Sequence, residues 1–241
     1  MIKHIGIVGV SPEGAALFIR ELSRQSHRIG GPNAQLRVSM HNEPLAGYLN
    51  AIRLGDWHGV AALLSKSAEV VAAAGAEVCV TPDHAVQYAL HLAEHETPIP
   101  WRSMPEAVAD AIAREGRSTV GLIGTRWVTA ASTYQTHLGL RGIQVLSPDG
   151  DEAEDLDRII VDELLKGEVR TSSREKVRQI IRNLEARGCE GIVLASSEAP
   201  LAVEPGSNGL SVYDAGSILA EAVVRDALSL AGRGEVAPPA A

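Results

Sequence analysis

Short apolar runs alternate along the chain with longer segments in which apolar residues recur at helical spacing. The runs that read as strands cover residues 5–10, 35–41, 78–81, 119–124, 143–146 and 192–195. Helices are expected at residues 15–26, 59–74, 172–187 and 215–230, the first of them after a turn at residues 11–14. Because strands alternate with helices, the pattern predicts an α/β fold with a parallel sheet covered by helices on both faces.

The clearest helix signal lies between Ser172 and Arg187. Its apolar face consists of Val177, Ile180, Ile181 and Leu184. Ser172 and Glu175 have the spacing of a capping box, and Gly188 stands where this helix is expected to end. The acidic run at residues 149–157 is interpreted as a solvated loop or a helix start rather than a metal site.

An internal repeat divides the chain into two similar halves. The sequence GIVG at residues 6–9 recurs as GLIG 115 positions later. A glycine followed by an apolar run, at residues 75–80, recurs 113 positions later. Carried at this second offset, Asp83 and Ser196 fall on equivalent strand ends. Two similar halves tend to place such ends across a shared cleft, so the repeat predicts a functional site between Asp83 and Ser196.

Charge and cysteine content exclude several classes of protein. The formal net charge of −8 argues against a nucleic-acid partner, because phosphate binding needs a basic face. No apolar run reaches the roughly 18 residues of a membrane span. Residues 1–4 lead directly into a strand, so we expect no signal peptide and a cytoplasmic location. Cys79 and Cys189 form neither a metal spacing nor a disulfide framework and are expected to be buried packing residues.

Polar residues gather where the predicted strands end. Ligands in such folds bind beyond the carboxyl ends of the strands, which selects residues 9–11, 41–43, 81–84, 124–129 and 194–198. Ser11, Thr125 and Thr129 offer hydroxyls near expected helix starts, where anions are favoured, although each could instead be a helix cap. His41 and Asn42 end the second strand and could contact the rest of a substrate. These positions predict a small-molecule site that suits a carboxylate.

Several motifs occur in the order of one known family. They are GIVG with Ser-Pro-Glu at 6–13, Gly-Thr with a later Thr at 124–129, Arg-Ile-Ile through Gly at 158–167, Gly-Cys-Glu through Ser-Glu-Ala-Pro at 188–200, and Tyr-Asp at 213–214. Together they resemble the aspartate/glutamate (Asp/Glu/hydantoin) racemase superfamily over nearly the whole chain. The resemblance implies two pseudo-symmetric Rossmann-like (flavodoxin-like) parallel-sheet domains with the site in the cleft between them. Residues 1–100 with 207–231 would form the first domain, 101–206 the second, and 232–241 a flexible tail.

Members of this superfamily typically use two cysteines, one at the tip of each half. One thiolate removes a proton from the carbon next to a carboxylate, and the other thiol returns a proton on the opposite face. In this chain Asp83 stands at the first cysteine position and Ser196 at the second, in agreement with the internal repeat. An alignment with a gap would instead put Val80 or Thr81 at the first position.

The residues at these two tips suggest what chemistry remains. Asp83 can act as a base whose pKa burial would raise, or its side chain can cap the next helix. His84 could titrate near neutral pH or lie in solvent. Ser196 is a poor base, but its hydroxyl can donate a hydrogen bond to a carboxylate or developing enolate, or be passive. Ser197 and Glu198 are expected to contact the substrate, with Glu198 orienting its neighbours.

Three functions are compatible with these residues. The preferred one is an enzyme in which Asp83 performs one-base chemistry at a carbon next to a carboxylate: isomerisation, decarboxylation, elimination or ring closure. The second is amino-acid racemisation by Asp83 and Ser196, which would require the serine to deprotonate carbon. The third is a non-catalytic carboxylate binder. The resemblance implies an acidic amino acid or small dicarboxylate as substrate and a homodimer, and the absence of a PLP lysine motif, nucleotide loop or metal spacing predicts no cofactor.

Overall fold

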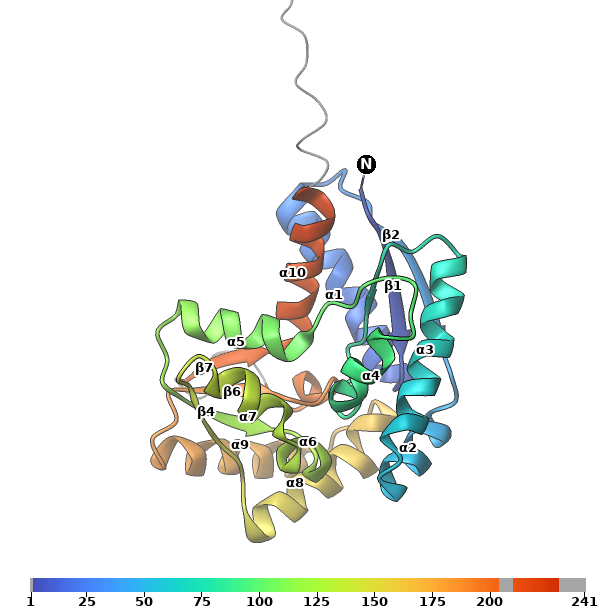
Figure 1. The fold of residues 1–241 in the computed structure, drawn as a ribbon. Helices are drawn as coiled ribbons and strands as arrows, with labels where there is room; N and C mark the ends of the chain where they lie inside the picture. The colour runs from blue at the N-terminus through green and yellow to red at the C-terminus, as the bar shows by residue number, and fades with distance from the viewer. Residues whose placement is uncertain (1, 204–209, 230–241) are drawn as a thin grey trace, which may run out of the picture.

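The computed structural model describes residues 2–203 and 210–229, and two parallel sheets covered by helices make up its frame (Figure 1). The strands are β1 (His4–Gly9), β2 (Arg37–Asn42), β3 (Val78–Val80), β4 (Thr119–Ile123), β5 (Gln144–Leu146), β6 (Gly191–Leu194) and β7 (Ser211–Asp214). The helices are α1 (Pro12–Gly30), α2 (Leu45–Leu54), α3 (Trp57–Ala73), α4 (Leu90–Glu94), α5 (Met104–Arg114), α6 (Arg126–Ala130), α7 (Ser132–Gly139), α8 (Gly150–Asp162), α9 (Thr171–Ala186) and α10 (Ala215–Ser229). The predicted α/β fold is confirmed, and the tail expected at residues 232–241 lies outside the described residues.

The two sheets are built on one plan. The first has the strand order β2–β1–β3 and the second the order β5–β4–β6–β7. Ile7 lies opposite Val80 in the first sheet, and Leu122 lies opposite Val193 in the second. The two offsets of the sequence repeat, 115 and 113, therefore relate the paired strands of one sheet to those of the other.

The repeated glycines let a helix pack directly on β1 and on β4. A Cβ atom on Gly6 would lie only 2.6 Å from Cγ2 of Val71 in α3. At the equivalent place in the second half, a Cβ on Gly121 would lie 3.0 Å from Cδ1 of Leu184 in α9. Any larger residue would push the helix away from the sheet, which explains in physical terms why both halves carry glycine here.

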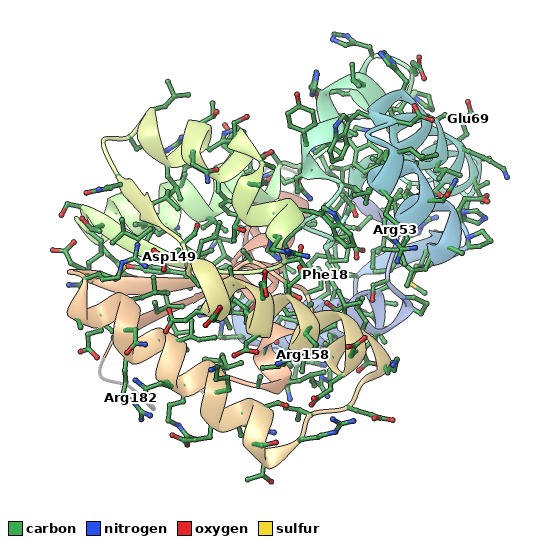
Figure 2. The ribbon with its side chains drawn as sticks, turned by 90° about the horizontal axis from the view of Figure 1, so that it is seen from below. Phe18, Arg53, Glu69, Asp149, Arg158 and Arg182 are labelled. Carbon is green, nitrogen blue, oxygen red and sulfur yellow. The ribbon has the colours of Figure 1, made fainter. Side chains whose placement is uncertain are left out.

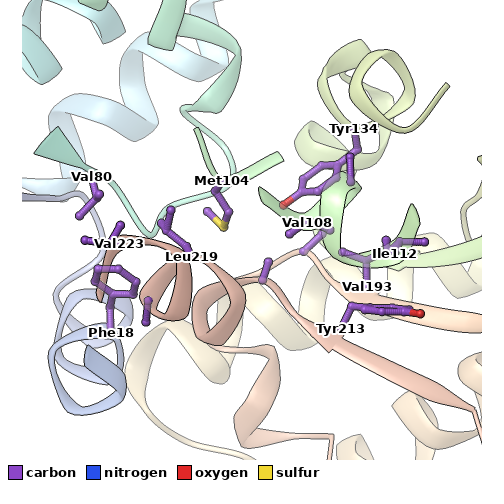
Figure 3. Close-up of a cluster of buried hydrophobic side chains, with 14 of the residues drawn as sticks. Phe18, Val80, Met104, Val108, Ile112, Tyr134, Val193, Tyr213, Leu219 and Val223 are labelled. Carbon is purple, nitrogen blue, oxygen red and sulfur yellow. The ribbon is translucent and has the colours of Figure 1, made fainter. Parts of the chain in front are cut away.

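One apolar core serves both halves. It joins Phe18 of α1 to Ile112 of α5 and Tyr134 of α7. Leu219 and Val223 of α10 belong to the same cluster, and Figure 3 shows them between the two halves. Seen from below in Figure 2, the helices of the first half and those of the second lie on opposite sides of the molecule, with Phe18 between them. Because their buried surfaces are continuous, the halves stabilise each other.

The last described segment belongs to both halves, in contrast to the division expected at residue 207. β7 pairs in parallel with β6 and forms the edge of the second sheet. α10 then packs against α1 of the first half and α5 of the second. A four-residue edge strand carries too short a pattern to be recognised from the sequence.

Two expectations about helix starts are corrected by the structure. The turn expected at residues 11–14 is the first turn of α1, because Ser11 caps the helix and its hydroxyl oxygen accepts a hydrogen bond from the N–H of Gly14 at 3.1 Å. The capping box expected in α9 does not form. That helix begins at Thr171, which places Ser172 inside it, and the Glu175 carboxylate pairs with arginines further along the helix. The apolar face of α9 is buried as predicted.

Candidate active site

The carboxyl ends of β1, β3, β4 and β6 meet at a small cavity between the two halves, where α2 lies across from α6 and α8 (Figure 1). Its volume is about 60 Å³. Pockets for drug-sized ligands typically have volumes of roughly 300–1,000 Å³, so this cavity suits a small ligand. The polar residues that line it are Ser11, Asp83, His84, Thr125, Ser196, Ser197 and Glu198. The cleft between halves that the repeat predicts is therefore present.

Asp83 and Ser196 occupy equivalent positions at this cavity. Asp83 lies three residues beyond Val80, and Ser196 lies three residues beyond Val193, its counterpart in the second sheet. Val80 itself is fully buried in the core. The hydroxyl of Thr81 accepts a hydrogen bond from the N–H of Asp83 at 3.4 Å and does not line the cavity. Of the three candidates for the first cysteine position, Asp83 is thus the one whose side chain lines the cavity.

The turn after β1 holds the Asp83 carboxylate. Oδ2 accepts a hydrogen bond from the N–H of Val10, and Oδ1 accepts one from the N–H of Ser11, each at 3.0 Å. The side chain therefore reaches across to the start of α1 instead of capping the segment that follows it. Two N–H donors fix the plane of the carboxylate at the wall of the cavity.

The environment of Asp83 makes it a base suited to near-neutral pH. Burial, together with the charge of Glu198, raises the pKa of the Asp83 carboxyl to about 8, against the opposing effect of the bonds from Ser11 and Val10. The side chain is only 7% exposed. A base with such a pKa combines a useful fraction of the ionised form with strong proton affinity.

Glu198 links the two strand ends. Its Oε1 accepts a hydrogen bond from the Ser11 hydroxyl at 2.5 Å, and its Oε2 accepts one from the Ser196 hydroxyl at 3.0 Å. Because the N–H of Ser11 also binds Asp83, an unbroken chain runs from Ser196 through Glu198 and Ser11 to Asp83. Two hydroxyl donors satisfy a carboxylate that is almost fully buried.

Several hydroxyls expected to bind a substrate are already used within the protein. The Ser11 and Ser196 hydroxyls both donate to Glu198, and the Ser197 hydroxyl donates to the carbonyl of Pro82 at 2.7 Å. In contrast, the Thr125 hydroxyl is buried without a hydrogen-bond partner among the described residues. Among the hydroxyls expected from the sequence, Thr125 is therefore the most available to a ligand. The Tyr48 hydroxyl at the same cavity is likewise buried without a partner among the described residues.

His84 is a neutral group fixed by Tyr134. Its Nδ1 lies 2.8 Å from the Tyr134 hydroxyl, and the two rings stack with centroids 5.8 Å apart. Burial lowers the pKa of His84 to about 3, so the expectation that it titrates near neutral pH is wrong. If the hydroxyl donates to Nδ1, the ring proton resides on Nε2. That Nε2 is buried and has no partner within the described part of the chain, so it can serve a ligand in the cavity as a donor.

Three residues expected to contact the substrate do not line the cavity. Nδ1 of His41 instead lies 3.0 Å from the Ser67 hydroxyl. The amide of Asn42 packs over Gly9, where a Cβ atom would lie 2.4 Å from its Nδ2. The Thr129 hydroxyl lies 3.4 Å from a carbonyl within its own helix. The end of β2 is therefore outside this site.

Sequence reasoning missed an apolar wall on the cavity. The wall consists of Leu45, Tyr48, Leu49 and Ile52 of α2, Trp127 and Val128 of α6, Ile160 of α8, and Leu165 in the turn that follows α8. The spacing of the α2 members, at positions 45, 48, 49 and 52, is that of one helix face and was a readable signal.

The family model for Asp/Glu/hydantoin racemase matches residues 7–223. The chain belongs to this family. Among solved structures, a candidate Asp/Glu racemase from Yersinia pestis is 29% identical, with a TM-score of 0.83 over 94% of this chain and 100% of that one. An aspartate racemase homologue from Pyrococcus horikoshii OT3 is 26% identical, with a TM-score of 0.81 over 94% and 99%.

A more distant relative shares only the fold. The glutamate racemase from Francisella tularensis, solved with D-glutamate, is 14% identical, with a TM-score of 0.66 over 98% of this chain and 84% of that one. The arrangement of two parallel-sheet domains is thus shared with racemases of known structure.

The two cysteines of this racemase-family chain lie away from the cavity. Cys79 is in the middle of β3, where burial raises its pKa to about 12. Cys189 packs in the cluster beneath α8 and α9, and burial raises the pKa of its thiol as well. A buried thiol that resists ionisation is a packing residue, as the sequence predicted.

Other sites are few in the described part of the chain. There, no group of three His, Cys, Asp or Glu side chains is arranged to hold a metal ion. Residues 2–203 and 210–229 contain no helix with the length and apolarity needed to cross a bilayer. A larger groove of about 880 Å³ runs along α5, β7 and α10. It is lined in part by the Arg225–Glu221 ion pair. None of the polar residues that line the small cavity lines this groove.

Proposed function

We propose that this protein is an enzyme that acts at the carbon next to a carboxylate of a small substrate, with Asp83 as a single base and no cofactor. One observation carries the proposal. The Asp83 carboxylate lies buried at the strand end equivalent to Ser196, fixed by two N–H groups and with its pKa raised to about 8. Membership of the racemase family supports the reaction class, because the names of its members refer to racemases of aspartate and glutamate, amino acids whose α-carbon bears a carboxylate.

The proposed step transfers one proton. The ionised Asp83 takes the proton from the α-carbon, and the electron pair of that C–H bond moves into the substrate carboxyl group to form an enediolate. Thr125 Oγ1 and the Nε2–H of His84, both buried without partners in the described structure, would donate hydrogen bonds to this developing charge. Reprotonation from Asp83 on the same face, after its proton has exchanged with solvent, gives exchange without inversion. Departure of a leaving group with its bonding electron pair from the neighbouring β-carbon instead forms a carbon–carbon double bond and gives a lyase.

A second candidate function is racemisation, and one contact favours it. The Ser196 hydroxyl donates to Glu198, so a proton removed on the second face could pass through the serine to a carboxylate. The hydroxyl remains a far weaker base than a thiolate at neutral pH, and Glu198 already accepts a second hydrogen bond from Ser11. One-base chemistry therefore remains the better proposal.

Proton NMR in D₂O tests both reactions at once. The protein is incubated with both enantiomers of small amino acids and with related carboxylic acids, and loss of the α-proton signal is followed together with chirality. We expect exchange without inversion or a new product, at a rate that rises with pH through about 8 as Asp83 ionises. Exchange with inversion at comparable rates for both enantiomers would favour racemisation instead.

Two variants separate the role of Asp83 from its structural bonds. Asp83→Asn should lower the exchange rate by roughly 10²- to 10⁴-fold, the usual contribution of a positioned base. Asp56→Asn is the matched control, because Asp56 also accepts a backbone N–H bond, as the cap of α3, but lies outside the cavity. Unchanged exchange in Asp83→Asn would refute the proposed base. Tight binding with no exchange under any condition would leave the protein a binder.

A further inference from the structure

The composition of the cavity wall bears on the substrate of the proposed reaction. The apolar wall supplies side chains from both halves, with Leu49 and Ile52 on one side and Val128 and Ile160 on the other. Burial of each additional CH₂ group against such a surface strengthens binding by roughly fourfold. Most of the lining residues would therefore strengthen the binding of a substrate that has an apolar side chain.

The charges at the cavity point the same way. Among the described residues no Lys or Arg lines it, and its acidic side chains there are Asp83 and Glu198. The arginine next to Thr125 in the chain, Arg126, is exposed and forms an ion pair with Asp157 at 3.5 Å. The imidazole of His84 is neutral and contributes no positive charge. A second carboxylate on the substrate would be buried beside two acids without a cation to pair with it.

We infer that the substrate carries one carboxylate and a short apolar side chain, and is not an acidic amino acid or a dicarboxylate. The inference rests on the proposed function, since it concerns the ligand of the same cavity. The volume of about 60 Å³ restricts the side chain to a few carbon atoms. The wall residues Leu49 and Leu165, which are both half-buried, would contact that side chain from opposite halves.

Pairs of amino acids whose side chains have the same number of carbon atoms test the inference through binding alone. Norvaline and glutamate differ by a terminal methyl in place of a carboxylate, and 2-aminobutyrate and aspartate differ in the same way. Isothermal titration calorimetry of the full chain should show the apolar member of each pair binding at least tenfold more tightly. Equal or tighter binding of the acidic member, or no binding of either member of both pairs, would overturn the inference.

Charged variants of the wall make the test specific. Leu49→Arg adds a cation on α2 and should reduce the preference for the apolar member by tenfold or reverse it. Leu54→Arg is the matched control on the same helix, because Leu54 is 74% exposed and does not line the cavity, and it should leave the preference unchanged. Leu165→Arg places the same charge on the opposite half and should act like Leu49→Arg. If both Leu49→Arg and Leu165→Arg kept the preference for the apolar amino acid unchanged, the proposed contact between these residues and the substrate side chain would be wrong.

The two proposals fail in different ways. If norvaline or 2-aminobutyrate binds more tightly but shows no α-proton exchange and no new product in D₂O, the substrate inference stands and the proposed catalysis falls. If glutamate or aspartate binds more tightly and exchanges its α-proton, the catalysis stands and the inference falls.

Discussion

The hydroxyl of Ser11 donates a hydrogen bond to the carboxylate of Glu198 at 2.5 Å, although the two residues lie 187 positions apart in the chain. Ser11 is also the cap of α1, and Glu198 follows the end of β6. A single hydroxyl therefore anchors the first helix of one half to the strand end of the other. It also carries the chain of hydrogen bonds that joins Ser196 to Asp83.

Replacement of Ser11 by alanine should destabilise the protein by more than the loss of a helix cap. The variant loses the cap bond to Gly14 and leaves Glu198 without one of its two donors, so we expect a loss of roughly 2–4 kcal/mol. Ser103→Ala is the matched control, because Ser103 caps α5 without a bond to the other half, and it should cost about 0.5–1 kcal/mol. Urea denaturation of both variants measures the difference. Equal losses would mean that the bond to Glu198 contributes nothing.

Gly14→Ala should be destabilising, even though alanine normally favours a helix. An added Cβ would lie 2.6 Å from Cβ of Ser197, so α1 and the turn after β6 would have to separate. Such overpacking typically costs about 1–3 kcal/mol. Gly139→Ala, in α7, meets no atom within 4 Å and should be neutral or slightly stabilising. Thermal melts of the two variants measure the change in melting temperature. A higher melting temperature for Gly14→Ala would show that α1 and the turn at Ser197 can move apart at little energetic cost.

Asp83 should make stability fall as the solution becomes more alkaline. Folding raises its pKa from 3.8 to about 8, so between these values the folded protein keeps a proton that the unfolded chain has released. The contribution of the protonated Asp83 carboxyl to the free energy of unfolding is complete below pH 3.8. It is lost as the pH rises through 8. His84 acts in the opposite sense, because its pKa falls from 6.5 to about 3, but it has no further effect above pH 6.5. The window from pH 6.5 to 8 therefore separates the effect of Asp83 from that of His84.

We expect the free energy of unfolding to drop by roughly 2 kcal/mol across this window, since each unit of pKa difference corresponds to about 1.4 kcal/mol. Denaturant titrations at pH 6.5 and 8 measure it. Asp83→Asn should abolish the drop, whereas Asp56→Asn, a cap outside the cavity, should retain it. A drop of equal size in all three proteins would assign it to another group.

His84 should remain neutral throughout the physiological range. Burial lowers its pKa to about 3, so its ring signals should not move between pH 5 and 8 in a ¹H–¹⁵N NMR titration. If the Tyr134 hydroxyl donates its hydrogen bond to Nδ1, which lies 2.8 Å away, the same spectra should show an unprotonated Nδ1. Tyr134→Phe removes that donor and should raise the share of the other tautomer. A protonated Nδ1 in the unmodified protein would reverse the assigned direction of the bond.

The fold was readable from the sequence where its signals are local. Offsets of 115 and 113 matched the pairing of the strands, because a glycine-flanked apolar run is a short and self-contained pattern. Helix starts were harder to predict. Ser172 and Glu175 have capping-box spacing but lie inside α9. Ser103 and Glu106 have the same spacing, and there the Ser103 hydroxyl does cap α5 by accepting a hydrogen bond from the N–H of Glu106. Identical spacing cannot distinguish a helix start from a position inside a helix.

The site was readable only in part. The strand-end rule found Asp83 and Ser196, because it depends on topology alone. It did not distinguish Thr125, whose hydroxyl has no partner in the described structure, from Ser11, whose hydroxyl is engaged by Glu198. That difference depends on a side chain from the other half of the protein. The apolar wall was missed because α2 begins after Pro44 with no side-chain cap to mark it.

The shared core has a consequence for how the chain is made. Phe18 and Leu22 of α1 are buried in the same cluster as Val223 and Val224 of α10, which lie near the other end of the sequence. A ribosome adds roughly 5–20 residues per second, so the apolar face of α1 waits on the order of tens of seconds for its partner. During that time the nascent first half presents an uncovered face to chaperones and to neighbouring chains. Synthesis, more than the finished protein, is the stage at which this architecture is open to aggregation.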